Sequence, residues 1–140
     1  MQHVSQRIHM HIPRYNWVGF YLIDKNDHST LMLGPYVGSF TPHPKISLDQ
    51  GISGLAVSTR RVMVVDDVAE SATYQKVSEL VKSQISVPVL ARSRPVGVFN
   101  IDSYFRATFK PAQERDFAEA CAMVVGKVME KIMVPDLVNV

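Results

Sequence analysis

Polar side chains able to bind a ligand recur at every second position near the end of one apolar segment, residues 96–103. Because side chains alternate across a β-strand, Asn100 and Asp102 share one face of that strand. An amide donates and accepts hydrogen bonds, and a carboxylate accepts them. Polar groups on an interior strand face predict one wall of a small-molecule pocket. The apolar members of the same face are Val96 and Val98.

Two other apolar segments divide between two faces in the same way. In the segment that begins at Trp17, the rings of Trp17 and Tyr21 share the face opposite the aliphatic side chains, and Gln84 and Ser86 do so in a later segment. If the three segments share a sheet, its polar face carries two aromatic rings, two amides and a carboxylate. The glycine-bracketed Ser53 begins a short helix whose amides are expected to line the same pocket. The predicted ligand-binding residues are Trp17, Tyr21, Ser53, Gln84, Ser86, Asn100 and Asp102.

Each of these residues also has a plain structural reading. Trp17 and Tyr21 fit ordinary core aromatic residues equally well. Asp102 is as well suited to capping the turn that follows it as to binding a ligand. Ser53 lies in Gly-Ile-Ser-Gly, shorter than the nucleophile elbow of hydrolases, and no acid is placed to orient His43, so the pattern does not predict hydrolysis.

Composition is typical of one globular domain and excludes several classes of protein. The 140 residues are 46% hydrophobic and 20% charged, enough for one core and too few for two ordinary domains. Fifteen Lys and Arg against 13 Asp and Glu give a net charge of +2, without the dense basic stripe of a nucleic-acid binder. No apolar run is long enough to span a membrane, and no signal peptide is evident, so we expect a cytoplasmic protein.

Cysteine and histidine usage argues against redox, disulfide and metal chemistry. The only cysteine, Cys121, fits a small buried hydrophobic residue at four-residue spacing from Phe117 and Val125. The histidines lie in terminal or loop segments and make no zinc-binding pattern. We therefore expect neither a metal nor another cofactor.

Periodicity and turn signals predict an α+β fold with a mostly antiparallel, six-stranded sheet. Terminal helices are expected on one face of the sheet, and two short helices and the ligand pocket on the other. The predicted strands are 17–23, 30–37, 46–48, 62–65, 84–90 and 96–102. The predicted helices are 1–12, 51–57, 73–82 and 111–134, the last ended by Pro135.

The apolar residues of the terminal helices are more numerous than one sheet face should need. Such a surplus predicts a homodimer formed through these helices. The residues concerned are Val4, Ile8, Ile12, Phe117, Cys121, Val124, Val125, Val128 and Ile132.

The order of elements and six short motifs resemble a GAF domain, a PAS-like fold. The motifs are NWVGFYL from Asn16, LGPY from Leu33, GISG from Gly51, VDDV from Val65, VPV from Val87 and VGVFNIDS from Val96. The resemblance covers about residues 12–130 and makes 1–140 a single GAF domain with helical extensions. In these motifs and their order, the chain most resembles the free methionine-(R)-sulfoxide reductases of that superfamily.

The catalytic cysteines of that reductase family have no counterparts in this chain. The resemblance places Ser53 where the glycine-bracketed motif carries a cysteine, and a second cysteine position on or near Val77. A third falls in residues 41–44, where the loop is one residue longer here. Reductase chemistry needs a thiolate, because the cysteine sulfur must accept the oxygen of the sulfoxide and then exchange it for a disulfide.

The family's binding residues are partly kept, which implies a pocket with altered charge. Trp17 and Tyr21 match the family's aromatic wall, and Asp102 matches a carboxylate that receives the substrate ammonium group. Gln84 and Asn100 stand where the family has Glu and Asp, so shape is kept while two negative charges are lost. This pattern favours a ligand that is neutral, or zwitterionic with a different charge arrangement.

Two functions remain at this point. The favoured one is a non-catalytic sensor in which a small molecule alters the packing of the terminal helices. Its output would then pass through association with another protein. The alternative is a free methionine-(R)-sulfoxide reductase-like enzyme with a degenerate or altered active site. The ligand and the downstream output are not specified by the sequence.

Overall fold

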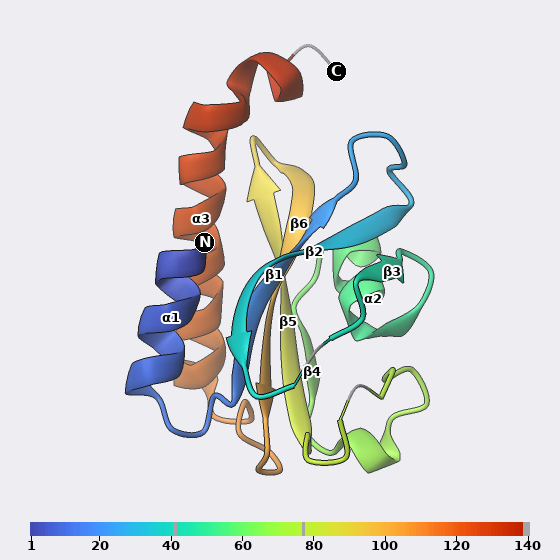
Figure 1. Cartoon of the computed structure of the whole chain (residues 1–140), viewed down its shortest axis with the longest axis vertical. Coiled ribbons are helices and arrows are strands. Elements are labelled where there is room, and N and C mark those ends of the chain that lie inside the picture. The colour runs from blue at the N-terminus through green and yellow to red at the C-terminus, as the bar shows by residue number, and fades with distance from the viewer. Residues whose placement is uncertain (41, 77, 139–140) are drawn as a thin grey trace.

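The computed structural model describes residues 1–40, 42–76 and 78–138, the last six through their backbone only. Six strands form one antiparallel sheet in the order β3-β2-β1-β6-β5-β4 (Figure 1). This arrangement confirms the predicted α+β fold class. The strands are β1 (Trp17–Ile23), β2 (Thr30–Gly38), β3 (Lys45–Ser47), β4 (Met63–Val65), β5 (Ser83–Ala91) and β6 (Arg94–Ser103).

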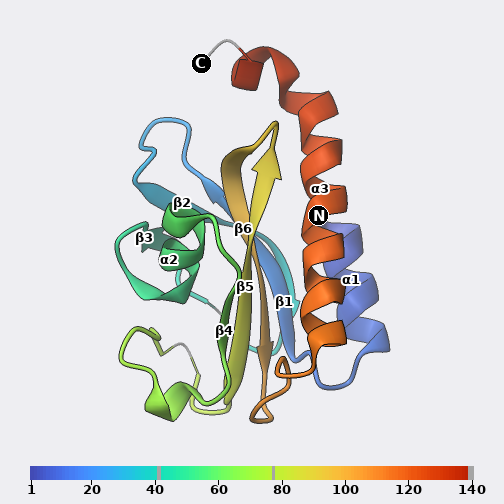
Figure 2. The same cartoon turned by 180° about the vertical axis from the view of Figure 1, so that it is seen from behind.

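Helices cover both faces of the sheet, as Figures 1 and 2 show. The terminal helices α1 (Gln2–His11) and α3 (Ala112–Val138) lie on one face, and α2 (Gly51–Thr59) lies on the other. Helix α3 runs on past the amino end of α1 (Figure 1). A one-turn 3₁₀ helix, η1 (Val68–Glu70), follows β4.

Strand alternation sorts the core into two clusters, one on each face of the sheet. The cluster under the terminal helices includes Val18, Phe20, Ile85, Phe99 and Ile101, all fully buried. The cluster on the α2 side includes Trp17, Tyr21 and Val98. The two faces predicted from alternation in β1, β5 and β6 are therefore correct. The exception is Val96, which packs with the first cluster because a bulge beside Val89 shifts the register.

The predicted helix over residues 73–82 is wrong. Apart from Val77, which lies outside the described residues, this stretch forms turns and coil. Serine hydroxyls accept backbone N–H groups in it: Ser71 from Tyr74 and Ser78 from Leu80. Such local bonds compete with helical ones. Leu80 is 57% exposed, so this stretch does not present a continuous buried face.

Most of the apolar stripe of α3, which comprises Phe117, Cys121, Val124, Val125, Val128 and Ile132, does not pack on the sheet. The sheet is contacted instead by the face that carries Ala118, Ala122, Val125 and Met129. A Cβ at Gly126 would lie 2.2 Å from the Leu90 carbonyl oxygen, so the helix approaches β5 too closely for large side chains there. The stripe residues left exposed are Phe117, Val124, Val128 and Ile132.

The predicted helix end at Pro135 is also wrong, because α3 continues to Val138. A proline inside a helix removes one backbone hydrogen bond and bends the axis without necessarily ending the helix. Figures 1 and 2 show the ribbon turning aside over its final turns.

Candidate functional site

Strand pairing brings most of the predicted site residues into two adjacent rows on the α2 side of the sheet. Trp17 of β1 is opposite Asp102 of β6, which is opposite Gln84 of β5. In the next row Asn100 lies between Gly19 and Ser86. The hairpin that fixes β5 against β6 turns through two residues of positive φ, 51° and 67°, as a type I′ turn requires.

A cavity of about 30 Å³ opens over these rows. A cavity needs roughly 10–15 Å³ to hold a water molecule, so this one is large enough for water or a small polar group. Six of the seven predicted site residues line it, and only Ser86 does not; its side chain is buried in the second row. The predicted residues that line the cavity are Trp17, Tyr21, Ser53, Gln84, Asn100 and Asp102.

Sequence reasoning missed half of the cavity wall. Pro42 and His43 come from the loop after β2, Ile46 from β3, and Gln75 from the turns after η1. The Tyr21 hydroxyl donates to the His43 carbonyl oxygen at 2.7 Å and so fixes this loop over the sheet. Loop residues show no periodicity that would reveal which way they face. The remaining wall residues, Gly51 and Ile52, begin α2 beside Ser53.

Among the described residues that line the cavity, Asp102 is the only one with a carboxyl group, and it is buried beside an amide. Gln84 Nε2 donates to Asp102 Oδ1 at 2.7 Å. Burial raises the pKa of Asp102 to about 7 against an ordinary value of 3.8, although the hydrogen bond from Gln84 opposes the rise. Burial and then the nearby Asp102 charge raise the pKa of the Tyr21 hydroxyl. Asp102 therefore changes its charge near neutral pH.

Asn100 connects the sheet to α2 and leaves one acceptor unused. Its Nδ2 donates to Ser53 Oγ at 2.7 Å, and both side chains are buried. The Asn100 Oδ1 atom has no hydrogen-bond partner among the described residues, and neither has the Trp17 Nε1–H donor. Unpaired polar atoms in an interior cost about 1–3 kcal/mol each, so they are rare unless a ligand or water meets them.

Trp17 also has the structural role weighed from the sequence. Its ring stacks at nearly parallel angles against Tyr36 and Phe40, with centroids 5.4 and 5.9 Å away. A Cβ at Gly38 would lie 2.3 Å from Trp17 Cδ1, and one at Gly19 would lie 2.6 Å from its Cη2. The ring thus packs over two glycines, and Trp17 is at the same time one of the residues that line the cavity.

No thiol faces the cavity. Cys121 is half-buried in α3 and packs against the cluster on the opposite face of the sheet. Burial raises the pKa of its thiol, which lowers the thiolate fraction at neutral pH. Ser53 Oγ is held by Asn100, with no imidazole bonded to it in the described structure.

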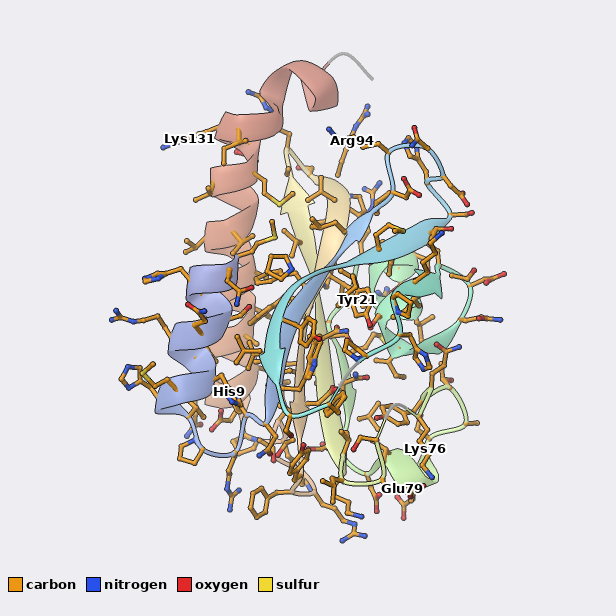
Figure 3. All side chains as sticks on the ribbon, in the orientation of Figure 1. His9, Tyr21, Lys76, Glu79, Arg94 and Lys131 are labelled. Carbon is orange, nitrogen blue, oxygen red and sulfur yellow. The ribbon has the colours of Figure 1, made fainter. Side chains whose placement is uncertain are left out.

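The described residues hold neither a metal centre nor a membrane-spanning helix. Within the described residues no cluster of three His, Cys, Asp or Glu side chains is arranged to hold a metal ion. No helix in the described part of the chain is both long and apolar enough to cross a bilayer. Figure 3 shows Tyr21 on the α2 side of the sheet and His9 on the α1 side.

Comparison with known proteins gives a consistent picture. The chain is 30% identical over 113 residues to the free methionine-R-sulfoxide reductase of Saccharomyces cerevisiae, covering 80% of this chain and 62% of that protein. It is 26% identical over 124 residues to the enzyme of the same name from Escherichia coli, covering 89% and 73%. The chain therefore spans less than two thirds of the length of its yeast relative.

Solved structures agree with this similarity. The type II free methionine-R-sulfoxide reductase from Thermoplasma acidophilum superposes with a TM-score of 0.86 at 30% identity, covering 94% of this chain and 90% of that one. The family profile described as GAF domain matches residues 2–130. Sheet order, helix placement and this match together show that the chain belongs to the GAF domain family.

Proposed function

We propose that this chain is a non-catalytic, small-molecule-binding sensor domain. The observation that carries the proposal is the side chain of Asn100, a cavity-lining residue, which is buried, donates to Ser53 and keeps an acceptor without a partner in the described structure. A group built only for packing would be cheaper as an apolar residue. A ligand that meets this acceptor offsets the cost of burying it.

The position of the thiol argues against the cysteine-dependent chemistry of the similar reductases. Within these 140 residues the single thiol, Cys121, is on the far side of the sheet from the cavity. A serine alkoxide is inaccessible near neutral pH and cannot be recycled through a disulfide. Similarity to two curated reductases nevertheless keeps a reductase with an altered site as the second candidate.

The proposal is tested by native mass spectrometry on protein purified from cells. We expect an adduct that is released on denaturation, that is lost in Asn100→Leu and that is kept in Asn26→Leu, a matched change in an exposed turn. The melting temperature of each variant reports whether it folds. An unliganded parent that turns over free methionine-R-sulfoxide with dithiothreitol, and loses that activity in Cys121→Ser, would establish the second candidate instead.

For the output of the sensor we propose a homodimer formed through the terminal helices. Val124 and Ile132 of α3 are 60% and 74% exposed, and they continue the row begun by Phe117. Strands β5 and β6 carry cavity residues on one face and support α3 on the other. A ligand that shifts these strands therefore acts directly on the surface where a second copy would bind.

A further inference from the structure

We propose that the cavity binds the neutral carboxamide group of its ligand, with the ligand N–H₂ donating to Asn100 Oδ1 and the ligand C=O accepting from Trp17 Nε1. This inference rests on the proposed ligand-binding function and names the chemistry of the ligand. Three independent features of the cavity support it: its unpaired atoms, its charge and its size.

Of the buried polar atoms without a partner in the described structure, one acceptor and one donor belong to residues that line the cavity, whereas the hydroxyl of Ser86, opposite Asn100, belongs to a residue outside its lining. Asn100 Oδ1 is an acceptor and Trp17 Nε1–H a donor, both fully buried and without a partner in the described structure. They belong to adjacent rows of one sheet face, since Trp17 is opposite Asp102 and Asn100 is two residues before Asp102. A single planar group that both donates and accepts satisfies the pair, and a primary amide is the simplest such group.

Charge argues against an ionic ligand of either sign. The described residues that line the cavity include no Lys or Arg to meet a carboxylate, and their ionisable members are Tyr21, His43 and Asp102. The only carboxyl group among them, Asp102, already accepts a hydrogen bond from Gln84, and burial raises its pKa to about 7, so an ammonium group would have to displace a proton from it near neutral pH. A neutral group avoids the desolvation cost that both ions meet.

Size argues for a head group rather than a whole amino acid inside the cavity. The volume of about 30 Å³ suits a small group such as a carboxamide and lies far below the roughly 300 Å³ of pockets that enclose a whole ligand. His43 and Gln75 of the cavity wall are exposed loop residues, so the rest of a larger ligand would extend past them.

The test uses the single tryptophan as a reporter. One Trp in the sequence gives one indole N–H signal in a ¹H–¹⁵N spectrum, so its assignment is unambiguous. The probes are acetamide, acetate and ethylammonium, which are similar in size and differ in charge. Titrated to about 0.1 M, acetamide should shift the indole signal saturably, with a Kd at least about tenfold below that of either ion.

Two substitutions at the acceptor and one control sharpen the result. Asn100→Leu should abolish the saturable shift with acetamide, and Asn26→Leu should leave it unchanged. Asn100→Asp adds a carboxylate in the same shape and should reverse the preference, so that ethylammonium binds better than acetamide by about tenfold or more. This reversal keeps the test valid if Asn100→Leu fails to fold.

The outcomes separate this inference from the proposed function. If ethylammonium or acetate binds best to the parent, the carboxamide assignment is overturned while ligand binding stands. If no probe moves the indole signal but native mass spectrometry finds an adduct, the assignment again falls alone. If no probe moves the indole signal and native mass spectrometry finds no adduct, the cavity holds water only and both proposals are overturned.

Discussion

Gln84 Nε2 donates a hydrogen bond of 2.7 Å to Asp102 Oδ1, at paired positions of β5 and β6. The amide satisfies one oxygen of a carboxyl group that is almost completely removed from water. It does not neutralise the charge, because an amide carries a dipole and no formal charge. The pKa of Asp102 therefore stays near 7, well above 3.8.

This pKa predicts that stability falls as pH rises from about 4 to about 7. Between those values the folded chain keeps a proton on Asp102 that the unfolded chain has released. The stabilisation is complete below the unfolded pKa and is lost by the folded pKa of about 7. Asp102→Asn, which is always neutral, should gain unfolding free energy above pH 7 on the order of 4 kcal/mol, and little near pH 4.

The check is urea denaturation of parent and Asp102→Asn over that pH range. Asp116→Asn, on an exposed position of α3, is the matched control and should follow the parent. A parallel pH dependence for parent and Asp102→Asn would show that Asp102 does not carry the effect.

Gln84→Leu is predicted to destabilise the chain mainly at high pH. The change removes the donor that favours ionised Asp102, so the pKa of Asp102 should rise further. We expect a loss of about 1–3 kcal/mol in unfolding free energy above pH 7, because the carboxylate is then charged and unpaired. Near pH 4 the loss should be smaller. An equal loss at both pH values would indicate a packing defect instead.

Gly126→Ala sets two opposing effects against each other in α3. Alanine favours a helix interior over glycine by about 1 kcal/mol. The new Cβ, however, would lie 2.2 Å from the Leu90 carbonyl oxygen, a backbone atom that cannot rotate away. Overpacking of this kind costs about 1–3 kcal/mol, so we expect a net loss of stability. Thermal melting gives the sign, and Ala120→Gly on the exposed face measures the propensity effect alone.

The close approach of α3 to β5 at Gly126 explains a difference between the two kinds of prediction. Side-chain alternation identified the two faces of the strands, whereas helical periodicity did not identify which apolar face of α3 is buried. In β1, β5 and β6 the period of two depends only on strand geometry, so the site side chains of Trp17, Gln84 and Asp102 were placed correctly. In α3 two apolar faces compete, one with larger residues and one with Ala118 and Ala122. Which of them meets the sheet depends on the distance between helix and strand, which no local pattern encodes.

The loop side of the cavity was beyond prediction for a different reason. His43 and Gln75 reach the cavity through turns whose bonds, such as Tyr21 to the His43 carbonyl, join segments 22 residues apart. Helical spacing after residue 73 was misleading, because serine side chains form turns there instead. The pairing of Asn100 with Ser53 could be anticipated only as a shared face, and its hydrogen bond required the position of α2.

The exposed row on α3 predicts that Val124→Glu breaks the proposed homodimer. Val124 is 60% exposed, so a charge there should leave the folded protomer intact while it would be buried without a partner in a dimer. Sedimentation velocity at about 10–100 μM should show a dimer for the parent and a monomer for Val124→Glu. Leu80→Glu is the matched control: Leu80 is 57% exposed and lies outside the terminal helices, so that variant should sediment as the parent does. A parent that is monomeric throughout this range, or a Val124→Glu variant that remains dimeric, would place any dimer interface elsewhere and refute a coupling through α3.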